Sequence, residues 1–391
     1  MLEGLVVVEL GSGVTTALAT RTMAGFGAEV VKVEPPEGDC LRHVGAFPNG
    51  RTDGESSAAH LYFNGGKSSV VLDLRQQAAR SALTAIVSAA DLLVTDRRRG
   101  ELEALGLDEP RLAAGFPKLS VVAVTPYGED GPKADHLVTE LTTFAAGGQL
   151  SLMGSPDREP VKPYGDQAGC QAALSVLGAA MTAVLRQLRT GRSSYVELAL
   201  QELQASAMDM QGPMAYNGDP PYPGYGKRIG NSTHSLWSYY PSRDGDVGIF
   251  VNPTNIDSFL AAIGRPDLRD RMSDKTFLAG EMRDLVGRWC AERTNAEVHA
   301  AAVEHGAPFS YVARPADLLA DPTLAETGIW HDIDAPGLGR LRMPGAPFAG
   351  SEPFQLAPAP QLGQHTTAVL ARYAGAIGED TRAIVGGWRG R

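Results

Sequence analysis

The sequence predicts a two-domain α/β protein whose larger domain is built on a parallel sheet with helices on both faces. Two observations lead to this prediction. Over residues 1–130, short runs of Val and Leu alternate with segments of helical periodicity, and continuous apolar strands are typical of parallel sheets buried on both faces. The chain also has 391 residues, which is too many for one ordinary hydrophobic core.

The predicted elements of the larger domain alternate regularly. Strands are expected at 5–10, 28–34, 68–75, 91–96, 119–128 and 194–200. Helices are expected at 15–26, 76–89, 101–108 and 169–191, with another beginning at residue 201.

Composition changes beyond this region. Residues 211–231 are so rich in Gly, Pro and Tyr that no regular element is expected, and the segment is interpreted as a linker or an active-site loop. A hairpin strand follows near 244–252, with helices up to about residue 304. The pattern then indicates a strand, a turn and a helix over 308–322, short strands in the tail, and a last helix over 365–375.

Composition and charge restrict the class of protein. Apolar residues make up 43% and charged residues 20%, which is typical of a soluble globular enzyme, and the net charge of -10 argues against nucleic-acid or anionic-membrane surfaces. Three widely spaced cysteines indicate neither a disulfide framework nor a metal site, so a reducing cytoplasm is expected. We find no signal peptide and no apolar run of membrane-spanning length, so no membrane association is expected.

The segment from Val6 to Glu34 has the outline of a dinucleotide-binding strand–helix–strand unit, with Glu34 where a ribose-binding acid would lie. Its glycine motif is incomplete, because the third glycine position is Thr16. Gly11 and Gly13 still permit a tight turn at a helix start, where backbone amides can hold an anion. A turn that contacts no ligand is an equally good interpretation.

Several further segments occur in a characteristic order. They are GAEVVKVEPPEGDCLR, YFNGGKSSVVLDLR, RRRGELEALGLD, TPYGEDGP, GDQAGCQAAL, LRTGRSSYVELALQE, SRDGDVGIFV, ADLLADPTLAETGIW and APQLGQHTTAVL. With them, the chain resembles the family III CoA-transferases, a group that includes formyl-CoA and carnitine CoA-transferases and 2-methylacyl-CoA racemases. The resemblance extends from about Leu2 to Leu370.

The resemblance implies a Rossmann-like large domain built from both ends of the chain, a smaller α+β domain, and a homodimer of two interlocked chains. We expect residues 1–205 and the returning segment 328–391 to form the large domain. Residues 206–232 would be the linker or active-site loop, and 233–327 the small domain. Acyl-CoA and a small carboxylic acid are the implied substrates, CoA being a substrate and not a permanently bound cofactor. Glu34 then becomes a structural or loop-anchoring acid.

The resemblance assigns catalysis to an aspartate that attacks the thioester and passes through covalent intermediates. Asp166, in PYGDQAG ahead of an alanine-rich helix, matches that aspartate. A simple helix N-cap is the alternative. Glu140 lies near an acidic position of the family that could orient the acceptor or exchange protons, or it is a solvated acid at a helix start.

The phosphates of CoA require basic partners. Arg42, Lys67 and Arg98 match basic positions of the family, with contact favoured for Arg42 and Arg98, and Gly11, Gly13 and Val14 would form the turn beside the CoA site. An exposed arginine loop and a solvated lysine are the alternatives.

Two other functions remain open at this stage. A 2-methylacyl-CoA racemase would need a histidine where this chain has Thr139, and His136 lies three residues earlier. A repurposed member that binds acyl-CoA, or does other acyl chemistry, is suggested by NGGKSS, which lacks basic residues that the family carries.

Overall fold

A computed structural model describes residues 1–154, 158–208, 236–346, 348, 350, 352–375 and 384–385. The chain divides into two compact units, the first made of residues 1–149, 163–212 and 327–391, and the second of residues 150–162 and 213–326. Residues 150–162, which the sequence predicts within the large domain, group with the second unit. Most of the predicted loop 206–232 lies outside the described residues.

The first unit contains a six-stranded sheet in which every strand is parallel to its neighbours, in the order β3-β2-β1-β4-β5-β6. The strands are β1 Val6–Leu10, β2 Glu29–Glu34, β3 Ser68–Val71, β4 Leu92–Thr95, β5 Ser120–Thr125 and β6 Tyr195–Ala199. The order reverses between β1 and β4, and open α/β sheets bind ligands at the carboxyl ends of the strands at such a reversal.

Alternate residues of each strand face opposite layers of the core. In β1, Val7 packs with Ala19 of α1 and Val176 of α7, whereas Val8 packs with the helices on the other face. Val7, Val8 and Leu10 of β1 are excluded from solvent because both faces of the sheet are covered. The buried parallel sheet predicted from the Val and Leu runs is therefore confirmed.

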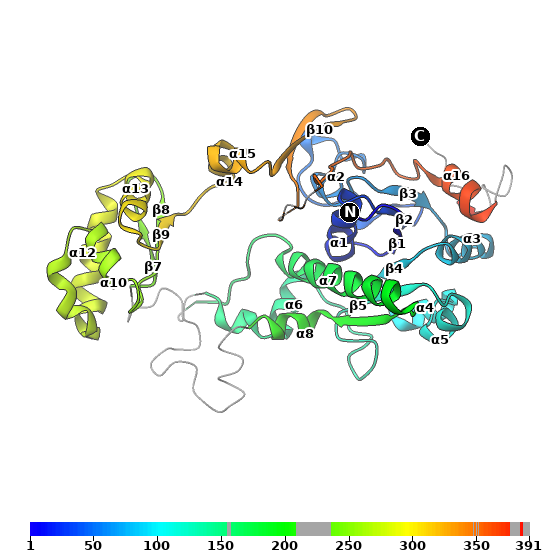
Figure 1. Ribbon diagram of the computed structural model, residues 1–391, viewed down its shortest axis with the longest axis horizontal. Helices are drawn as coiled ribbons and strands as arrows, with labels where there is room; N and C mark the ends of the chain where they lie inside the picture. Colours follow the sequence, from blue (N-terminus) through cyan, green and yellow to red (C-terminus); the bar gives the residue numbers. More distant parts are fainter. Residues whose placement is uncertain are drawn as a thin grey trace. The chain divides into compact units, whose positions relative to one another are not determined.

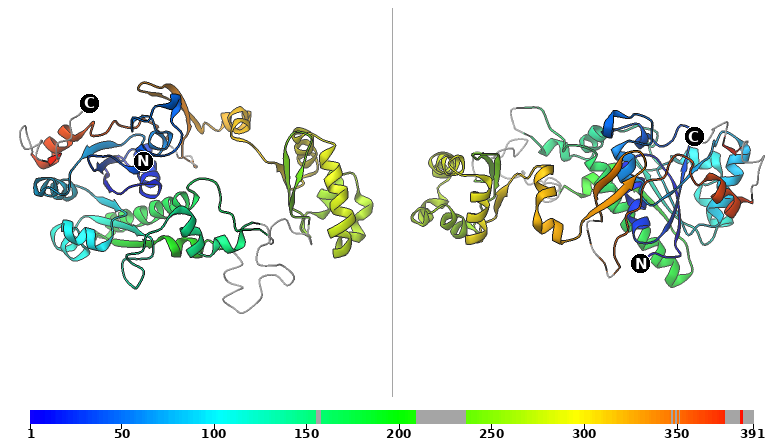
Figure 2. Two further views of the ribbon diagram at one scale, coloured as in Figure 1. Left: turned by 180° about the vertical axis from the view of Figure 1, so that it is seen from behind. Right: turned by 90° about the horizontal axis from the view of Figure 1, so that it is seen from above.

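Helices cover the two faces of the sheet unequally. The helices α1 and α7 pack side by side on one face, and α3, α4, α5 and the C-terminal helix cover the other (Figures 1 and 2). The helices of this unit are α1 Val14–Gly25, α2 Ala58–Phe63, α3 Gln77–Ser88, α4 Arg99–Leu105, α5 Glu109–Gly115, α6 Glu140–Ala146, α7 Gln167–Thr190, α8 Leu200–Ser206 and α16 Thr366–Val369.

The long helix α7 is long and apolar enough to cross a membrane by length and composition alone. Its most buried face is made of small residues, among them Ala172, Ala173 and Ala180, which let α7 approach the sheet and α1 closely. In the single chain, 33% of the most apolar window of α7 is buried.

The C-terminal segment returns to the first unit. An antiparallel hairpin, β10 Trp330–Ala335 and β11 Gly339–Pro344, is followed by a stretch that runs along the edge strand β3. There the amide of His365 donates to the carbonyl of Ser69, and the amide of Val71 donates to Oγ1 of Thr366. These bonds satisfy backbone groups at the edge of the sheet.

The second unit is a small α+β domain with its own core. A three-stranded antiparallel sheet has the order β7-β8-β9, and its apolar face packs on helices. Its elements are β7 Ser238–Pro241, β8 Asp246–Ile249, β9 Phe309–Tyr311, α10 Ile256–Ala262, α11 Lys275–Phe277, α12 Arg283–Ala291, α13 Asn295–His305, α14 Pro315–Ala320 and α15 Pro322–Glu326. Short 3₁₀ or π turns occur at Cys40–Arg42, Pro48–Gly50, Gln149–Leu152, Pro266–Ser273, Leu278–Met282 and Leu370–Ala374.

Candidate active site at the carboxyl edge of the sheet

The glycine turn Gly11–Gly13 follows β1 and leads into α1 at the point where the strand order reverses. Gly13 has φ +87°, a conformation that L side chains rarely adopt. The amide of Ser12 donates to Oδ2 of Asp96 at 2.8 Å, which ties the turn to the end of β4. Burial raises the pKa of Asp96 to about 6.

Protein groups occupy the two places that a dinucleotide would use. A side chain at Gly11 would lie 2.6 Å from Oγ1 of Thr16, so the residue in the third glycine position packs directly on the turn. The Glu34 carboxylate is buried and accepts hydrogen bonds from Arg42 and from Oγ of Ser69, and its Oε2 also accepts the amide of Asp39. Glu34 therefore anchors the loop that follows β2.

Beneath the glycine turn lies a cluster of fully buried charges centred on Glu9. Its carboxylate accepts hydrogen bonds from Nζ of Lys32 at 2.7 Å, from Nζ of Lys67 at 2.8 Å and from Oγ1 of Thr20 at 2.7 Å. Burial alone would raise the pKa of Glu9, but the two ammonium groups lower it to about 2. The cluster fixes the start of α1, because Thr16 and Thr20 both bond to Glu9.

The structure disagrees with the prediction that Lys67 contacts CoA. Its ammonium group is buried and donates to Glu9, to the carbonyl of Ala17 and to Oδ1 of Asn64, all within 2.9 Å. An ammonium group has three donors, so none is left for a ligand phosphate. Burial also lowers the pKa of Lys67 to about 8.

Arg42 is likewise a structural residue in this fold. Its guanidinium is buried and donates to Glu34, to Glu55 and to the backbone carbonyls of Gly54 and Pro360. These contacts use all five N–H donors of the side chain. The predicted contact between Arg42 and a CoA phosphate therefore does not fit the geometry.

Asp166 occupies the N-cap position of α7, yet its side chain caps nothing. The carboxylate is exposed, and within the described residues it receives no hydrogen bond from the helix amides. Its backbone, with φ -99° and ψ 58°, is not in the extended conformation that N-cap residues normally adopt. The helix-cap alternative therefore fails for the Asp166 side chain, although the residue does begin the helix.

Glu140 performs the capping instead. This residue begins α6, and its Oε1 accepts the amide of Ala168 at 2.7 Å while its Oε2 accepts the amide of Gly169 at 3.4 Å. Those two amides belong to the first turn of α7, next to Asp166. The structure thus brings together Asp166 and Glu140, which are 26 positions apart in the sequence.

The start of α1, which follows the glycine turn, lies against the start of α7. A side chain at Gly169 would lie 3.2 Å from Cβ of Val14, so the first turns of α1 and α7 are in close contact. The buried side chain of Val14 packs with Leu41 and Cys170. Gly13 and Val14 therefore adjoin the helix that Asp166 begins.

Arg98 differs from the arginines on either side of it. Arg97 pairs with Glu101 at 3.2 Å, and Arg99 pairs with Glu103 and Asp130. For the half-buried guanidinium of Arg98 we find no acidic partner in the part of the chain that the structure describes. Arg98 lies between β4 and α4, at the same edge of the sheet as the glycine turn.

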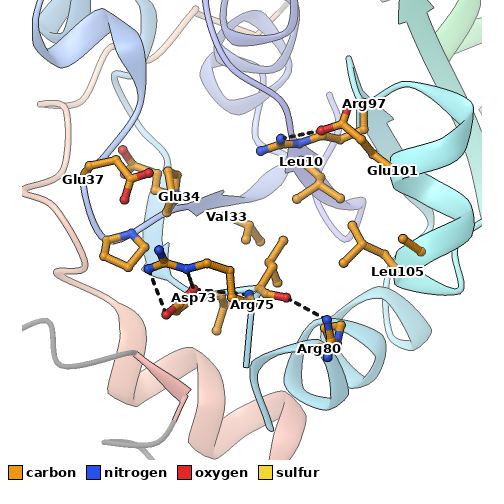
Figure 3. A pocket seen from close by; sticks show the side chains of 15 residues that line it. Leu10, Val33, Glu34, Glu37, Asp73, Arg75, Arg80, Arg97, Glu101 and Leu105 are labelled. Atoms are coloured by element: carbon orange, nitrogen blue, oxygen red, sulfur yellow. Dashed lines mark hydrogen bonds and ion pairs between the residues drawn. The ribbon is translucent and has the colours of Figure 1, made fainter. Parts of the chain in front are cut away.

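A cavity of about 410 Å³ opens at the carboxyl ends of β1, β2 and β3 (Figure 3). Its apolar lining comes from Leu10, Val33 and Leu105, among others. Charged side chains surround this lining, and they are Glu34, Glu37, Asp73, Arg75, Arg80, Arg97 and Glu101. A volume of this size suits a nucleotide-sized group.

Arg75 and Arg80 line this cavity and were not among the predicted site residues. Both follow the third strand, one in the loop and one in the first turns of α3, which is where a parallel sheet presents side chains to a ligand. The sequence offered one indication that these arginines could line a site, because they lie at and just after the end of a predicted strand. Among the described residues, no group of three or more His, Cys, Asp or Glu side chains is placed to hold a metal ion.

Among the described residues, the segment around Thr139 brings no histidine of the kind a racemase requires to Asp166. Thr139 is the N-cap of α6, and its Oγ1 accepts the amide of Thr142. His136 is exposed and packs edge-on against the ring of Tyr127, 5.9 Å away between ring centres. The side chain that adjoins Asp166 from this segment is the carboxylate of Glu140.

Comparisons with known proteins agree with this architecture. The family model described as CoA-transferase family III matches residues 2–366. Over 377 residues, the chain is 30% identical to succinyl-CoA:(R)-benzylsuccinate CoA-transferase subunit BbsE of Thauera aromatica, covering 90% of this chain and 89% of that protein. It is 27% identical to succinate–glutarate CoA-transferase of Agrobacterium fabrum, covering 95% of each.

Solved structures share the fold. A CAIB/BAIF family protein from Brucella suis matches with a TM-score of 0.81 and 27% identity, over 95% of this chain and 99% of that chain. The protein is thus an enzyme of the transferase class that acts on CoA thioesters. It belongs to family III of the CoA-transferases.

Proposed function

We propose that this enzyme moves CoA between an acyl-CoA and a small carboxylic acid through a covalent intermediate on Asp166. The observation that carries the proposal is the exposed, uncapped carboxylate of Asp166 at the start of α7. A carboxylate that accepts no hydrogen bond from its own helix keeps its lone pairs for nucleophilic attack. The adjoining glycine turn and Arg98 lie at the edge of the sheet where a ligand is expected.

The chemistry balances without a further cofactor. The Asp166 carboxylate attacks the thioester carbonyl and forms a mixed anhydride with the acyl group. The carbon–sulfur bond breaks at the same time, and CoA is released as a thiolate. The thiolate then attacks the aspartyl carbonyl, which releases the donor acid and leaves an aspartyl-CoA thioester. The acceptor carboxylate repeats the two steps in reverse and leaves as its CoA thioester, restoring Asp166.

The cavity in Figure 3 supports a location for the nucleotide end of CoA. Its apolar lining suits an adenine ring, and Arg75, Arg80 and Arg97 offer guanidinium groups to phosphates at the rim. Arg75 and Arg97 are paired with Asp73 and Glu101, and the pair of Arg97 with Glu101 is partly exposed, so it exchanges partners at little cost. Arg98 has no acidic partner among the described residues, so it need not leave an ion pair to bind a phosphate. We therefore assign the first phosphate contact to Arg98.

Succinyl-CoA is the donor that we propose to test first. The names of several relatives, including those of Thauera aromatica and Chloroflexus aurantiacus, specify succinyl-CoA as the CoA donor. The acceptors in those names differ from one relative to another, so the acceptor of this enzyme is to be found by screening small carboxylic acids.

We also propose that the enzyme is a homodimer. Three leucines on one face of α7 are solvent-exposed in the single chain, namely Leu174, Leu185 and Leu188 at 55%, 47% and 79%. A side chain at Gly178, on the same face, would meet no atom within 4 Å. Such an apolar helix face is typical of a surface that a second subunit covers. Leu185→Glu should therefore give a monomer in sedimentation equilibrium where the wild type gives a dimer.

A reducing compartment such as the cytoplasm fits the three cysteines. Cys40, Cys170 and Cys290 are all unpaired. Burial raises the pKa of Cys290 to about 12, so this thiol stays protonated and unreactive. Together these properties favour a protein that does not depend on oxidative folding.

Intact-protein mass spectrometry tests the mechanism directly. The enzyme is mixed with succinyl-CoA without an acceptor and quenched in acid, beside Asp166→Ala and the control Asp135→Ala, which removes another exposed acid. We expect an adduct of one CoA less one water on the wild type and on the control, and none on Asp166→Ala. An adduct that persists on Asp166→Ala would assign the nucleophile to another residue.

A further inference from the structure

We infer that Glu140 is a positioning residue that keeps the Asp166 carboxylate available for attack. This inference rests on the proposed role of Asp166 as the nucleophile. It replaces the sequence-based hypothesis that Glu140 orients the acceptor or exchanges protons.

The first turn of a helix offers amide donors that an N-cap side chain normally accepts, chiefly those of the second and third residues. In α7 these residues are Ala168 and Gly169, and Asp166 holds the N-cap position. Both amides are bonded to the carboxylate of Glu140, at 2.7 Å and 3.4 Å. The donors that would otherwise attract the Asp166 side chain are therefore occupied by an acid from another helix.

Glu140 is itself held in place by the start of α6. The amide of Thr142 donates to Oγ1 of Thr139, and the amide of Thr139 donates to Oγ1 of Thr142, a reciprocal pair that fixes the residues flanking Glu140. One turn further on, Phe144 is fully buried and anchors the helix in the core. The carboxylate therefore reaches α7 from a rigid support.

Removing the Glu140 carboxylate would free the two amides. The Asp166 carboxylate, one position before the helix, is the nearest acceptor in sequence, and a bond of this type shifts an equilibrium by about tenfold. A carboxylate bonded to backbone amides shares its lone pairs with them and turns away from the substrate. Displacement of a reacting group by about 1 Å also slows a reaction. The total loss of rate can therefore reach about 10²-fold.

The contacts of Glu140 also argue against a role in proton transfer. Both of its oxygens accept backbone amides, which are donors that do not exchange during a reaction cycle. A proton carrier needs an oxygen that faces the substrate. The effect of replacing the carboxylate by an amide of the same shape therefore separates the two roles.

Three variants test the inference, namely Glu140→Ala, Glu140→Gln and the control Glu202→Gln, which changes an exposed acid in the first turn of α8. Each is mixed with succinyl-CoA alone, and the rate of adduct formation on Asp166 is followed by quenched-flow mass spectrometry. The KM for donor and acceptor and the midpoint of thermal unfolding are measured alongside. Asp166→Ala is run in parallel.

A positioning role predicts that Glu140→Ala slows adduct formation by about 10- to 100-fold with the KM of both substrates nearly unchanged. Glu140→Gln should retain most of the rate, because its amide oxygen can still accept from Ala168, and Glu202→Gln should match the wild type. Equal losses in the Gln and Ala variants would indicate proton transfer and overturn the inference. A raised acceptor KM with an unchanged adduct rate would restore the acceptor-orienting hypothesis. An adduct on Asp166→Ala would instead refute the proposed function itself.

Discussion

The charges beneath the glycine turn and the charges at the edge of the sheet have opposite environments. Beneath the turn, Glu9, Lys32 and Lys67 are excluded from solvent, and every donor of Lys67 is used by the protein. At the edge, Asp166 is exposed and Arg98 half-buried, and neither has an acidic or basic partner among the described residues. Saturation by internal partners therefore separates the structural charges from the charges at the carboxyl edge, for which we propose a function.

The largest expected effect is on catalysis and arises at the edge. Asp166→Asn keeps the shape of the side chain but removes the nucleophile, so kcat should fall by on the order of 10⁴-fold. Stability should change little, because the carboxylate holds no other part of the protein. Steady-state kinetics with succinyl-CoA and a urea titration check both statements, and a variant within tenfold of the wild-type kcat would contradict them.

A substitution in the buried cluster around Glu9 should show the converse, a large effect on stability. Glu9→Gln removes the charge that faces Lys32 and Lys67, and breaking a buried ion pair costs about 3–5 kcal/mol of stability. The free energy of unfolding in urea measures the loss, with the exposed Glu202→Gln as a control for the same chemical change. A loss below about 1 kcal/mol would mean that the buried cluster is not a structural centre.

Arg98 allows a smaller and more selective test. Arg98→Ala should raise the KM for acyl-CoA about tenfold and leave kcat nearly unchanged, because a phosphate contact is present in both ground and transition states. Arg99→Ala is the matched control, since its guanidinium is already paired with Glu103 and Asp130. Equal effects of the two variants on KM would place the phosphates elsewhere.

A further test of the buried charges is the dependence of stability on acid. The pKa of Glu9 is lowered from 4.5 to about 2, and so is that of Glu34, where hydrogen bonds and charge from Arg42 overcome the effect of burial. A lowered folded-state pKa stabilises the protein above pH 4.5, and the contribution is lost as the pH falls toward 2. Urea midpoints across this range should decline, and Glu9→Gln should flatten the decline. An unchanged slope in Glu9→Gln would contradict the assignment.

Much of the fold could be predicted from the sequence. The Val and Leu runs of β1, β2, β4 and β5 are local patterns, and each becomes a parallel strand at the expected place. The sequence allowed a helix start at Glu140, and α6 does begin there, but a local pattern gives no partner for an acid at that position. Glu140 therefore looked like a solvated acid, and its bonds to Ala168 and Gly169 could not be inferred.

The sequence by itself determined the family, the class of reaction and the strand–helix alternation, because these depend on local patterns and on motifs that keep their order. Only the tertiary structure decided which charges are internal and which face the site. Arg42 is saturated in part by Pro360, which is 318 positions away, and Lys67 by Glu9, which is 58 positions away. A side chain becomes available to a ligand when the folded chain leaves its donors or acceptors unpaired, and that depends on segments that no local pattern connects.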